Sequence, residues 1–290
     1  MKKTYFYVAT AIFCWSTVAT ISKLLLTTLD SFQLLCFSAL FAFLFLLGYN
    51  IVTGNIKKFK TYTVKDFVVS VLITIPSTVL YYVFYYSGTD LMPASQAFIV
   101  NYMWPIMSIV FACIVLGDKL TFRKVLAILI SFAGVMISSR ISFSNIDREM
   151  LMGAVLCLLG AMSYGLFTAL NQKYNYDRWL SMMLGYLASF IVSLIIISAK
   201  GEAFLPSGIQ WAGFAWNGIF TMAIANVCWV QALRLGNTAK VSNLAYITPF
   251  ASLVWTVIFL KEKIEIYSII GLVMIVLGIF VQMKRSSNQK

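Results

Sequence analysis

The sequence contains no histidine, and this absence excludes several kinds of chemistry. Zinc sites of the HExxH type, serine–histidine pairs and histidine proton relays all need an imidazole ring. The five cysteines lack CxxC spacing, and no Walker A sequence is present to bind the phosphates of ATP. We therefore expect no metal site, no cofactor, no enzyme activity and no direct use of ATP.

Charged residues are also scarce, at 11% of the chain against 61% hydrophobic residues. A soluble domain carries about 25% charged residues, so we expect no soluble domain. The apolar runs reach about 20 residues and lack period-two alternation, which indicates membrane-spanning helices rather than barrel strands. We predict an all-α membrane protein with ten transmembrane helices. Their expected positions are residues 5–26, 32–52, 66–87, 94–116, 121–139, 151–171, 179–199, 211–233, 240–260 and 265–283.

The net charge of +12 indicates a topology once the charges are placed around these spans. With the N-terminus in the cytoplasm, the cytoplasmic segments carry +13 (16 − 3) and the outer segments −1 (6 − 7), which sum to +12. Positive charge on the cytoplasmic side is the usual pattern of membrane proteins. We therefore expect a multi-pass protein of the cytoplasmic membrane with both termini cytoplasmic, and we do not expect nucleic acid as a partner. A cleaved N-terminal signal peptide is the alternative, and it would leave nine spans.

Two segments of the chain are similar, residues 97–140 and 241–284, at an offset of 144 residues. Pro105 falls on Pro249, and each proline lies near the middle of a long apolar segment. Two half-length membrane repeats, each with a broken helix, are typical of transporters that bind their solute between the halves. Further matches are Tyr102 with Tyr246, Asp118 with Glu262 and Gly134 with Gly278.

Each half of the chain contains five predicted spans, with the boundary in the external loop at residues 140–150. Because five is an odd number, the second half must enter the membrane upside down relative to the first. We therefore predict two inverted five-helix repeats, residues 1–140 and 141–290, around a central cavity.

The two prolines predict opened helical turns inside the membrane. A proline leaves the carbonyl four residues earlier without its amide donor, which is Asn101 for Pro105 and Ala245 for Pro249. An unpaired carbonyl is costly in hydrocarbon, so it must face protein or a water-filled cavity. We expect Pro105 and Pro249 to act as hinges beside a binding site. The alternative is a simple kink whose carbonyl is satisfied by neighbouring helices.

Helical spacing collects polar and aromatic residues on the faces of several spans. Trp15, Trp104 and Tyr164 also fall near span centres, where an indole N–H or a phenol O–H needs a partner. Packing between helices is the alternative for these three. The residues that we expect to bind a substrate are Trp15, Thr78, Tyr82, Tyr85, Asn101, Trp104, Tyr164, Asn226, Trp229 and Thr248.

Such a set of aromatic, amide and carbonyl groups suits a neutral or zwitterionic organic solute with an apolar part. It does not suit a metal ion or a polyphosphate. Charges are nearly absent from the span interiors. We expect Lys23 to extend to the outer surface, with a substrate carboxylate as its alternative partner. Asp118 and Glu262 follow the ends of their spans, and we expect them to be solvated or to lie at helix ends.

At these residues the chain resembles the drug/metabolite transporter superfamily, EamA type. Within it, the chain is most similar to the bacterial aromatic amino acid exporters, through Val100–Pro105, Tyr246–Pro249 and Trp15–Thr17. The resemblance implies a basket of ten helices around a cavity that opens alternately to each side, and export of amino acids across a bacterial inner membrane. It also adds Tyr102 and Tyr246 to the expected site. One departure is Tyr164, where those exporters tend to have tryptophan.

We therefore predict a monomeric secondary transporter that exports aromatic and other neutral amino acids and related small metabolites. A second hypothesis keeps the fold and changes the solute to a nucleoside, a choline-like amine or a sugar phosphate. A channel or an intramembrane enzyme is the third, although no nucleophile–base or metal constellation is visible in the sequence.

Overall fold

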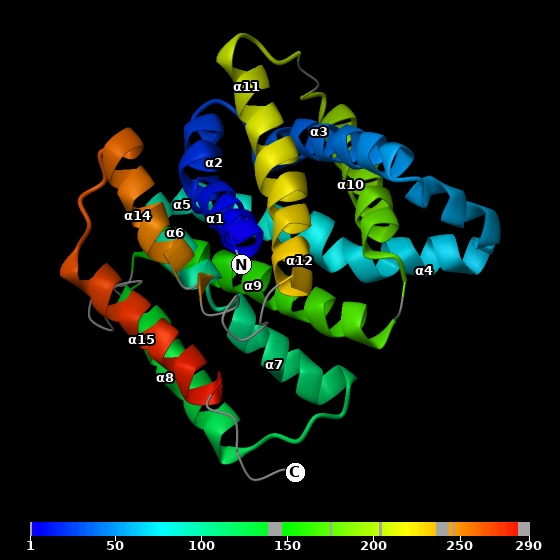
Figure 1. Cartoon of the computed structure of the whole chain (residues 1–290). Helices are drawn as coiled ribbons and strands as arrows, with labels where there is room; N and C mark the ends of the chain where they lie inside the picture. Colours follow the sequence, from blue (N-terminus) through cyan, green and yellow to red (C-terminus); the bar gives the residue numbers. More distant parts are fainter. Residues whose placement is uncertain are drawn as a thin grey trace.

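The structure is a bundle of helices. It is a computed structural model, and it describes residues 2–138, 147–174, 176–202, 205–235, 244–245 and 247–283, among which no strand occurs. Figure 1 shows the helices running in several directions around a common centre. The predicted all-α class is confirmed. The elements of the first half are α1 (Lys2–Ser16), α2 (Val18–Leu26), α3 (Ser31–Val52), η1 (Asn55–Thr61), α4 (Val64–Ile75), η2 (Pro76–Leu80), α5 (Tyr81–Leu91), α6 (Ala94–Asn101), α7 (Trp104–Val115) and α8 (Phe122–Ser138).

The rest of the described chain is also helical. Within the described residues, six helical segments of the molecule are long and apolar enough to cross a membrane, and α14 and α15 are shorter apolar helices. The elements are α9 (Arg148–Lys173), α10 (Arg178–Lys200), α11 (Ile209–Ala215), η3 (Trp216–Ile224), α12 (Ala225–Leu235), α14 (Ile247–Leu260) and α15 (Ile266–Met283).

The fourth predicted span is broken, as the proline pattern indicated. Helix α6 ends at Asn101 and α7 begins at Trp104, so Tyr102 and Met103 lie in the break. Pro105 therefore belongs to the first turn of α7, where a missing amide proton costs little. In the second half, Pro249 lies in the first turn of α14. Both prolines therefore lie in the first turn of a helix.

Three further irregularities were not expected from the sequence. The first span is interrupted at Thr17, between α1 and α2, and the Thr17 hydroxyl donates to the Cys14 carbonyl (2.8 Å). The third and eighth spans each contain a π-helical segment, η2 and η3. A π turn adds one residue to a helical turn and rotates everything after it. It therefore changes which residues face the centre of the molecule.

Helices α8 and α15 pack closely along small residues and lie side by side in Figure 1. A Cβ atom on Gly134 would lie 2.7 Å from the Gly271 carbonyl oxygen, and one on Gly278 would lie 2.7 Å from that of Ala127. Because the later residue of one helix faces the earlier residue of the other, the two helices run antiparallel. Ser131 donates to the Ile275 carbonyl (3.3 Å) near the middle of this contact.

A second pair of close contacts joins the halves through α3 and α10. A Cβ atom on Gly185 of α10 would lie 2.5 Å from the Thr74 hydroxyl of α4. A Cβ atom on Gly218 of η3 would collide with the Ser38 carbonyl of α3. Thr74 and Gly218, which take part in these two contacts, are 144 residues apart.

Lys23 and Glu262 meet helix ends rather than solvent. The Lys23 ammonium donates to the carbonyls of Thr89 and Asp90 (2.7 Å each), where α5 ends. The Glu262 carboxylate accepts from the amides of Ala94 (2.7 Å) and Ser95 (3.0 Å), where α6 begins. Both contacts place a charge where the helix dipole is favourable to it. The extension of Lys23 to the outer surface stays a prediction; its bond to the Asp90 carbonyl lies at an exposed position.

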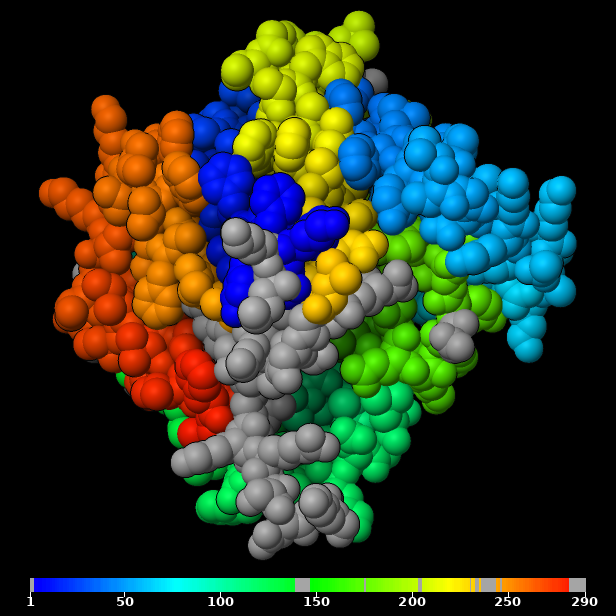
Figure 2. Space-filling model, viewed as in Figure 1, coloured from blue at the N-terminus to red at the C-terminus, as the bar shows by residue number. Residues whose placement is uncertain are grey.

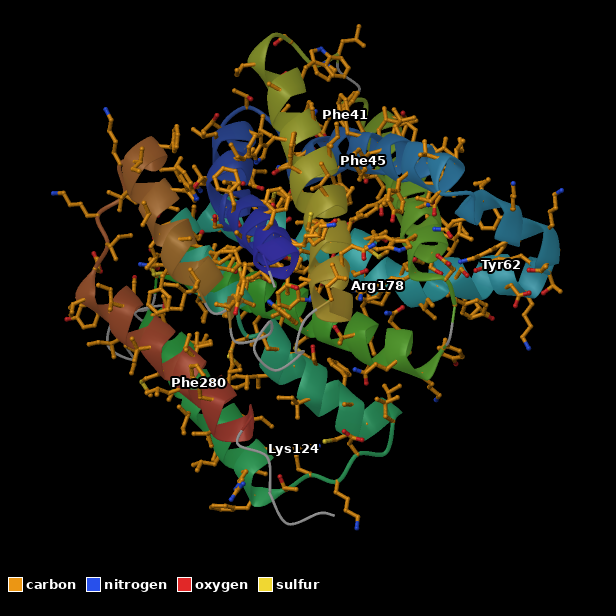
Figure 3. All side chains as sticks on the ribbon, viewed as in Figure 1. Phe41, Phe45, Tyr62, Lys124, Arg178 and Phe280 are labelled. Carbon is orange, nitrogen blue, oxygen red and sulfur yellow. The ribbon has the colours of Figure 1, made fainter. Side chains whose placement is uncertain are left out.

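Asp118 occupies the position in the first half that Glu262 holds in the second. Its carboxylate is half-exposed and lies 3.6 Å from the Lys124 ammonium at the start of α8. Figure 3 labels Lys124 there. An exposed pair of this kind contributes little to stability, about 0–1 kcal/mol.

Candidate substrate cavity

A cavity lies between the broken first and fourth spans, the two π-helical spans, α9, α10 and the start of α14. Its volume is ≈ 80 Å³. One water molecule needs about 10–15 Å³ on a comparable measure, so the space exceeds that of a single water several-fold. The lining residues are Trp15, Val18, Ser77, Tyr81, Tyr82, Phe98, Asn101, Tyr102, Trp104, Tyr164, Met182, Tyr186, Thr221, Asn226, Trp229, Ala245 and Thr248.

Helix α1, which carries Trp15, lies between the eighth and ninth spans. Figure 2 shows α1 (blue) between α12 (yellow) and α14 (orange) on the viewed face. The Trp15 ring packs against Trp229 of α12 with centroids 5.5 Å apart. Helix α1 therefore brings its tryptophan against the wall that the second half supplies.

Most of the residues expected from the sequence come together at this cavity. Trp15, Tyr82, Asn101, Tyr102, Trp104, Tyr164, Asn226, Trp229 and Thr248 all line it, and so does Ala245, whose carbonyl the proline pattern had singled out. Tyr246 lies outside the described residues.

Thr78 and Tyr85 do not line the cavity, although both are fully buried. The Thr78 hydroxyl donates to the Thr74 carbonyl of its own helix (3.0 Å), and the Tyr85 ring stacks on Tyr81 at 5.7 Å. Ser77, Tyr81 and Tyr82 are the residues of the third predicted span that line the cavity.

Several lining residues were not predicted from the sequence. Tyr81 directly follows η2 and Thr221 lies within η3, and no simple motif marks these π-helical segments apart from Pro76 at the start of η2. Met182 and Tyr186 are spaced i, i+4 on α10, which places them on one face, but such a pair is common in helix packing. The full set of missed residues is Val18, Ser77, Tyr81, Phe98, Met182, Tyr186 and Thr221.

Aromatic rings form one wall of the cavity. Trp104 meets Tyr164 edge to face, with ring centroids 5.2 Å apart, and Tyr81 lies 5.4 Å from Tyr164. Such pairs contribute about 0.5–1.5 kcal/mol beyond their buried area, so they hold the wall in a fixed arrangement. The wall joins residues from three separate spans.

The polar groups of the cavity are uncharged. Among the described residues, none that lines it is Lys, Arg, Asp or Glu. Asn101 donates through Nδ2 to the Tyr81 hydroxyl (2.9 Å), and its Oδ1 has no partner in the described part of the chain. The Thr248 hydroxyl is likewise buried without a partner among those residues. Buried polar atoms are normally paired, so these two mark places where a solute or water can bind.

Metal ligands do not gather anywhere in the described residues, where no group of three or more Cys, Asp or Glu side chains occurs. The described chain therefore offers no cluster of carboxylates or thiolates of the kind that holds Zn²⁺, Ca²⁺ or Mg²⁺.

Comparison with known proteins gives a consistent result. The model of the EamA-like transporter family matches residues 2–140 and 151–283, which is most of the chain in two copies. The transporter YvbV of Bacillus subtilis is 26% identical over 77% of this chain and 73% of its own, and a transporter of Clostridium kluyveri is 25% identical over 100% and 95%. The aromatic amino acid exporter YddG of Ancylobacter novellus is 23% identical over 59% of this chain and 61% of its own.

A solved crystal structure has the same fold. It aligns with 98% of this chain and 97% of its own chain, with a TM-score of 0.68 and 19% sequence identity.

Proposed function

Because the chain belongs to the EamA-like transporter family, we propose that this transporter exports neutral amino acids, aromatic ones among them, and related small metabolites. Its relatives are named as transporters, so the protein acts on a solute by moving it rather than by converting it. The proposed mechanism is alternating access, in which the two halves rock against each other around a fixed site.

The observation that carries this proposal is the cavity built by both halves at the breaks in their helices. Asn101 and Trp104 come from the first half, and Asn226, Trp229 and Thr248 come from the second. A site shared between two rigid halves can open to either side when the halves rotate relative to each other. We propose that the lining residues, with Tyr246, bind the solute, and that Pro105 and Pro249 form the hinges.

The packing of α8 against α15 supports an inverted repeat. Ser131 and Ile275 are 144 residues apart, and they contact each other at the centre of an antiparallel pair. A two-fold axis in the membrane plane brings equivalent residues together in this way, whereas parallel repeats would not. We propose ten spans in two inverted repeats, residues 1–140 and 141–290, in the bacterial inner membrane, with both termini cytoplasmic and the chain acting as a monomer.

The chemistry of the cavity separates the alternative solutes. A sugar phosphate needs cationic partners, and no cationic side chain lines the cavity. A choline-like amine could use the aromatic wall through cation–π contacts, so it is the second candidate. A nucleoside has no feature of the cavity in its favour beyond the aromatic rings.

The proposal can be tested with purified protein in liposomes. We expect saturable movement of labelled phenylalanine, methionine or threonine down a gradient, and competition by unlabelled neutral amino acids. Choline in the same assay tests the second candidate. If no member of a broad amino-acid panel moved or competed, the assignment of amino acids would be wrong.

A further inference from the structure

Four of the eight hydroxyl groups that line the cavity among the described residues donate their protons to backbone carbonyls of the protein. A backbone carbonyl can only accept a hydrogen bond, so a hydroxyl that faces one must donate its proton to it. Such a hydroxyl can then only accept a hydrogen bond from a solute, through the lone pairs of its oxygen. The pairs are Tyr102 with Ala245 (2.7 Å), Ser77 with Thr74 (3.0 Å), Tyr186 with Met222 (3.4 Å), and Thr221 with Asn217.

The cavity contains two asparagines, one in each half of the chain. Each uses its amide nitrogen for a hydrogen bond inside the protein and leaves its amide oxygen for a solute. Asn226 donates through Nδ2 to the Met222 carbonyl (2.7 Å). Because that carbonyl has no proton, the amide cannot turn round, and Asn226 Oδ1 remains for a solute. Asn101 donates through Nδ2 to the Tyr81 hydroxyl, which leaves its buried Oδ1 without a partner among the described residues.

The cavity is therefore rich in acceptors. Its amide and hydroxyl oxygens and the negative faces of its aromatic rings attract hydrogen-bond donors and positive charge. A solute that is only an anion meets no cationic side chain there. Its remaining donors are neutral indole and hydroxyl groups, which suit a carboxylate less well than a cation would.

We propose that the cavity selects its solute through an ammonium group bound by Asn101 Oδ1 and Asn226 Oδ1, and that Tyr81 positions the Asn101 amide. This proposal rests on the proposed transport function and narrows it. The solute class is a compact apolar body that carries a primary ammonium, with or without a carboxylate. Amines made by decarboxylating neutral amino acids belong to this class, and deaminated acids do not.

A matched set of three compounds tests the selection. Methionine carries both charged groups, 3-(methylthio)propylamine keeps only the ammonium, and 4-(methylthio)butanoate keeps only the carboxylate. We expect the amine to compete with labelled methionine flux within about 10-fold of methionine itself, and the acid to be weaker by about 10-fold or more, the value of a hydrogen bond to a charged group. Thermal stabilisation of the purified protein by each compound gives a readout that is independent of transport.

Substitution of the asparagines tests the residues. Asn226→Leu and Asn101→Leu should each weaken the binding of methionine and of the amine by about 10-fold or more, because one hydrogen bond to a charged group is lost. Asn226→Asp keeps the shape of the side chain, and it should increase the preference for the amine over the acid. Asn50 is the matched control, since its Nδ2 also donates to the carbonyl four residues earlier (2.9 Å) but lies away from the cavity. Asn50→Leu should leave the amine-to-acid preference unchanged.

Tyr81→Phe tests the positioning role. The ring and its packing remain, but the acceptor for Asn101 Nδ2 is removed, so the amide can rotate and turn its N–H groups toward the solute. We expect the amine-to-acid preference to fall several-fold while the melting temperature changes little. Tyr49→Phe is the control, because Tyr49 packs on Trp179 and does not line the cavity.

The possible outcomes distinguish failure of the ammonium proposal from failure of the proposed transport function. If amino acids are transported but the acid competes as well as the amine, the ammonium proposal is overturned and the transport function stands. If no amino acid moves, yet the amine stabilises the wild-type protein and not Asn226→Leu, the ammonium site stands and amino-acid export is overturned. If neither compound acts on the wild-type protein, both are overturned.

Discussion

The hydroxyl of Tyr102 donates a 2.7 Å hydrogen bond to the carbonyl oxygen of Ala245. Pro249, four residues after Ala245, has no amide proton to offer that carbonyl. The carbonyl accepts instead from the Thr248 amide (2.9 Å) and from the tyrosine of the other half. A residue in the break between α6 and α7 therefore bonds to the carbonyl just before α14, which couples these helices.

Tyr102→Phe should weaken this coupling. The substitution removes one buried hydrogen bond and keeps the ring, so we expect a loss of about 1 kcal/mol in unfolding free energy and a slower transport cycle. Melting temperature and flux in liposomes measure the two effects. Tyr5→Phe is the control, since Tyr5 is exposed near the N-terminus. Wild-type stability and flux in Tyr102→Phe would mean that this bond does not couple the helices.

Trp104→Ala should lower transport with the fold intact. The indole forms the cavity wall against Tyr164, and its removal takes away contact area that a solute with an apolar part would use. We expect the KM to rise by about 10-fold or more, as for other losses of apolar contact in a binding pocket. Trp211→Ala is the control, because Trp211 lies away from the cavity and is partly exposed. Normal flux through Trp104→Ala would make Trp104 a packing residue.

Pro105→Ala should slow the cycle without changing solute affinity. An alanine there supplies the amide proton that can bond to the Asn101 carbonyl, which favours one continuous helix through the break. We therefore expect a lower maximal rate with a KM close to that of the wild type. Pro206→Ala is the control, since Pro206 lies in a loop outside the helices. Unchanged kinetics would mean that Pro105 only shapes the helix and does not act as a hinge.

Gly134→Ala and Gly48→Ala form a matched pair for the packing of α8 on α15. At Gly134 the new methyl group would meet the Gly271 backbone, whereas Gly48 has nothing within 4 Å. We expect Gly134→Ala to cost about 1–3 kcal/mol by overpacking, and Gly48→Ala to be neutral or slightly stabilising. Melting temperatures of the two purified variants decide the point. Equal melting temperatures would show that the two helices can move apart without cost.

The sequence was sufficient for the features that depend on composition and repetition. The all-α class, the break before Pro105 and most of the cavity residues follow from apolar runs, the 144-residue offset and helical spacing. The features that it missed depend on contacts made only in the folded chain. The π-helical segments η2 and η3 are marked by no simple motif, and the partners of Lys23 and Glu262 lie at the ends of helices distant in sequence.

Glu262→Gln should loosen the side of the bundle where α5 meets α6. The Glu262 carboxylate accepts from two amides at the start of α6, and a neutral amide keeps only one acceptor oxygen and no charge. Loss of a helix cap costs about 0.5–2 kcal/mol, so the contact between Glu262 and α6 should be broken more often. If the halves rock as proposed, this loosening opens the cavity toward the outer surface.

The opening can be measured with a cysteine in place of Phe98, a cavity residue that is nearly fully buried. A membrane-impermeant maleimide applied from outside should label Phe98→Cys faster in the Glu262→Gln background than in the wild-type background. The proteins without that cysteine give the background from the native thiols. Glu202→Gln is the control, because Glu202 is exposed and pairs with Lys200 after α10 (3.6 Å). If a contact closes a pathway, weakening that contact must increase access to the pathway. Equal labelling rates with and without Glu262→Gln would therefore show that the Glu262 cap stabilises α6 locally and does not hold the outer side closed.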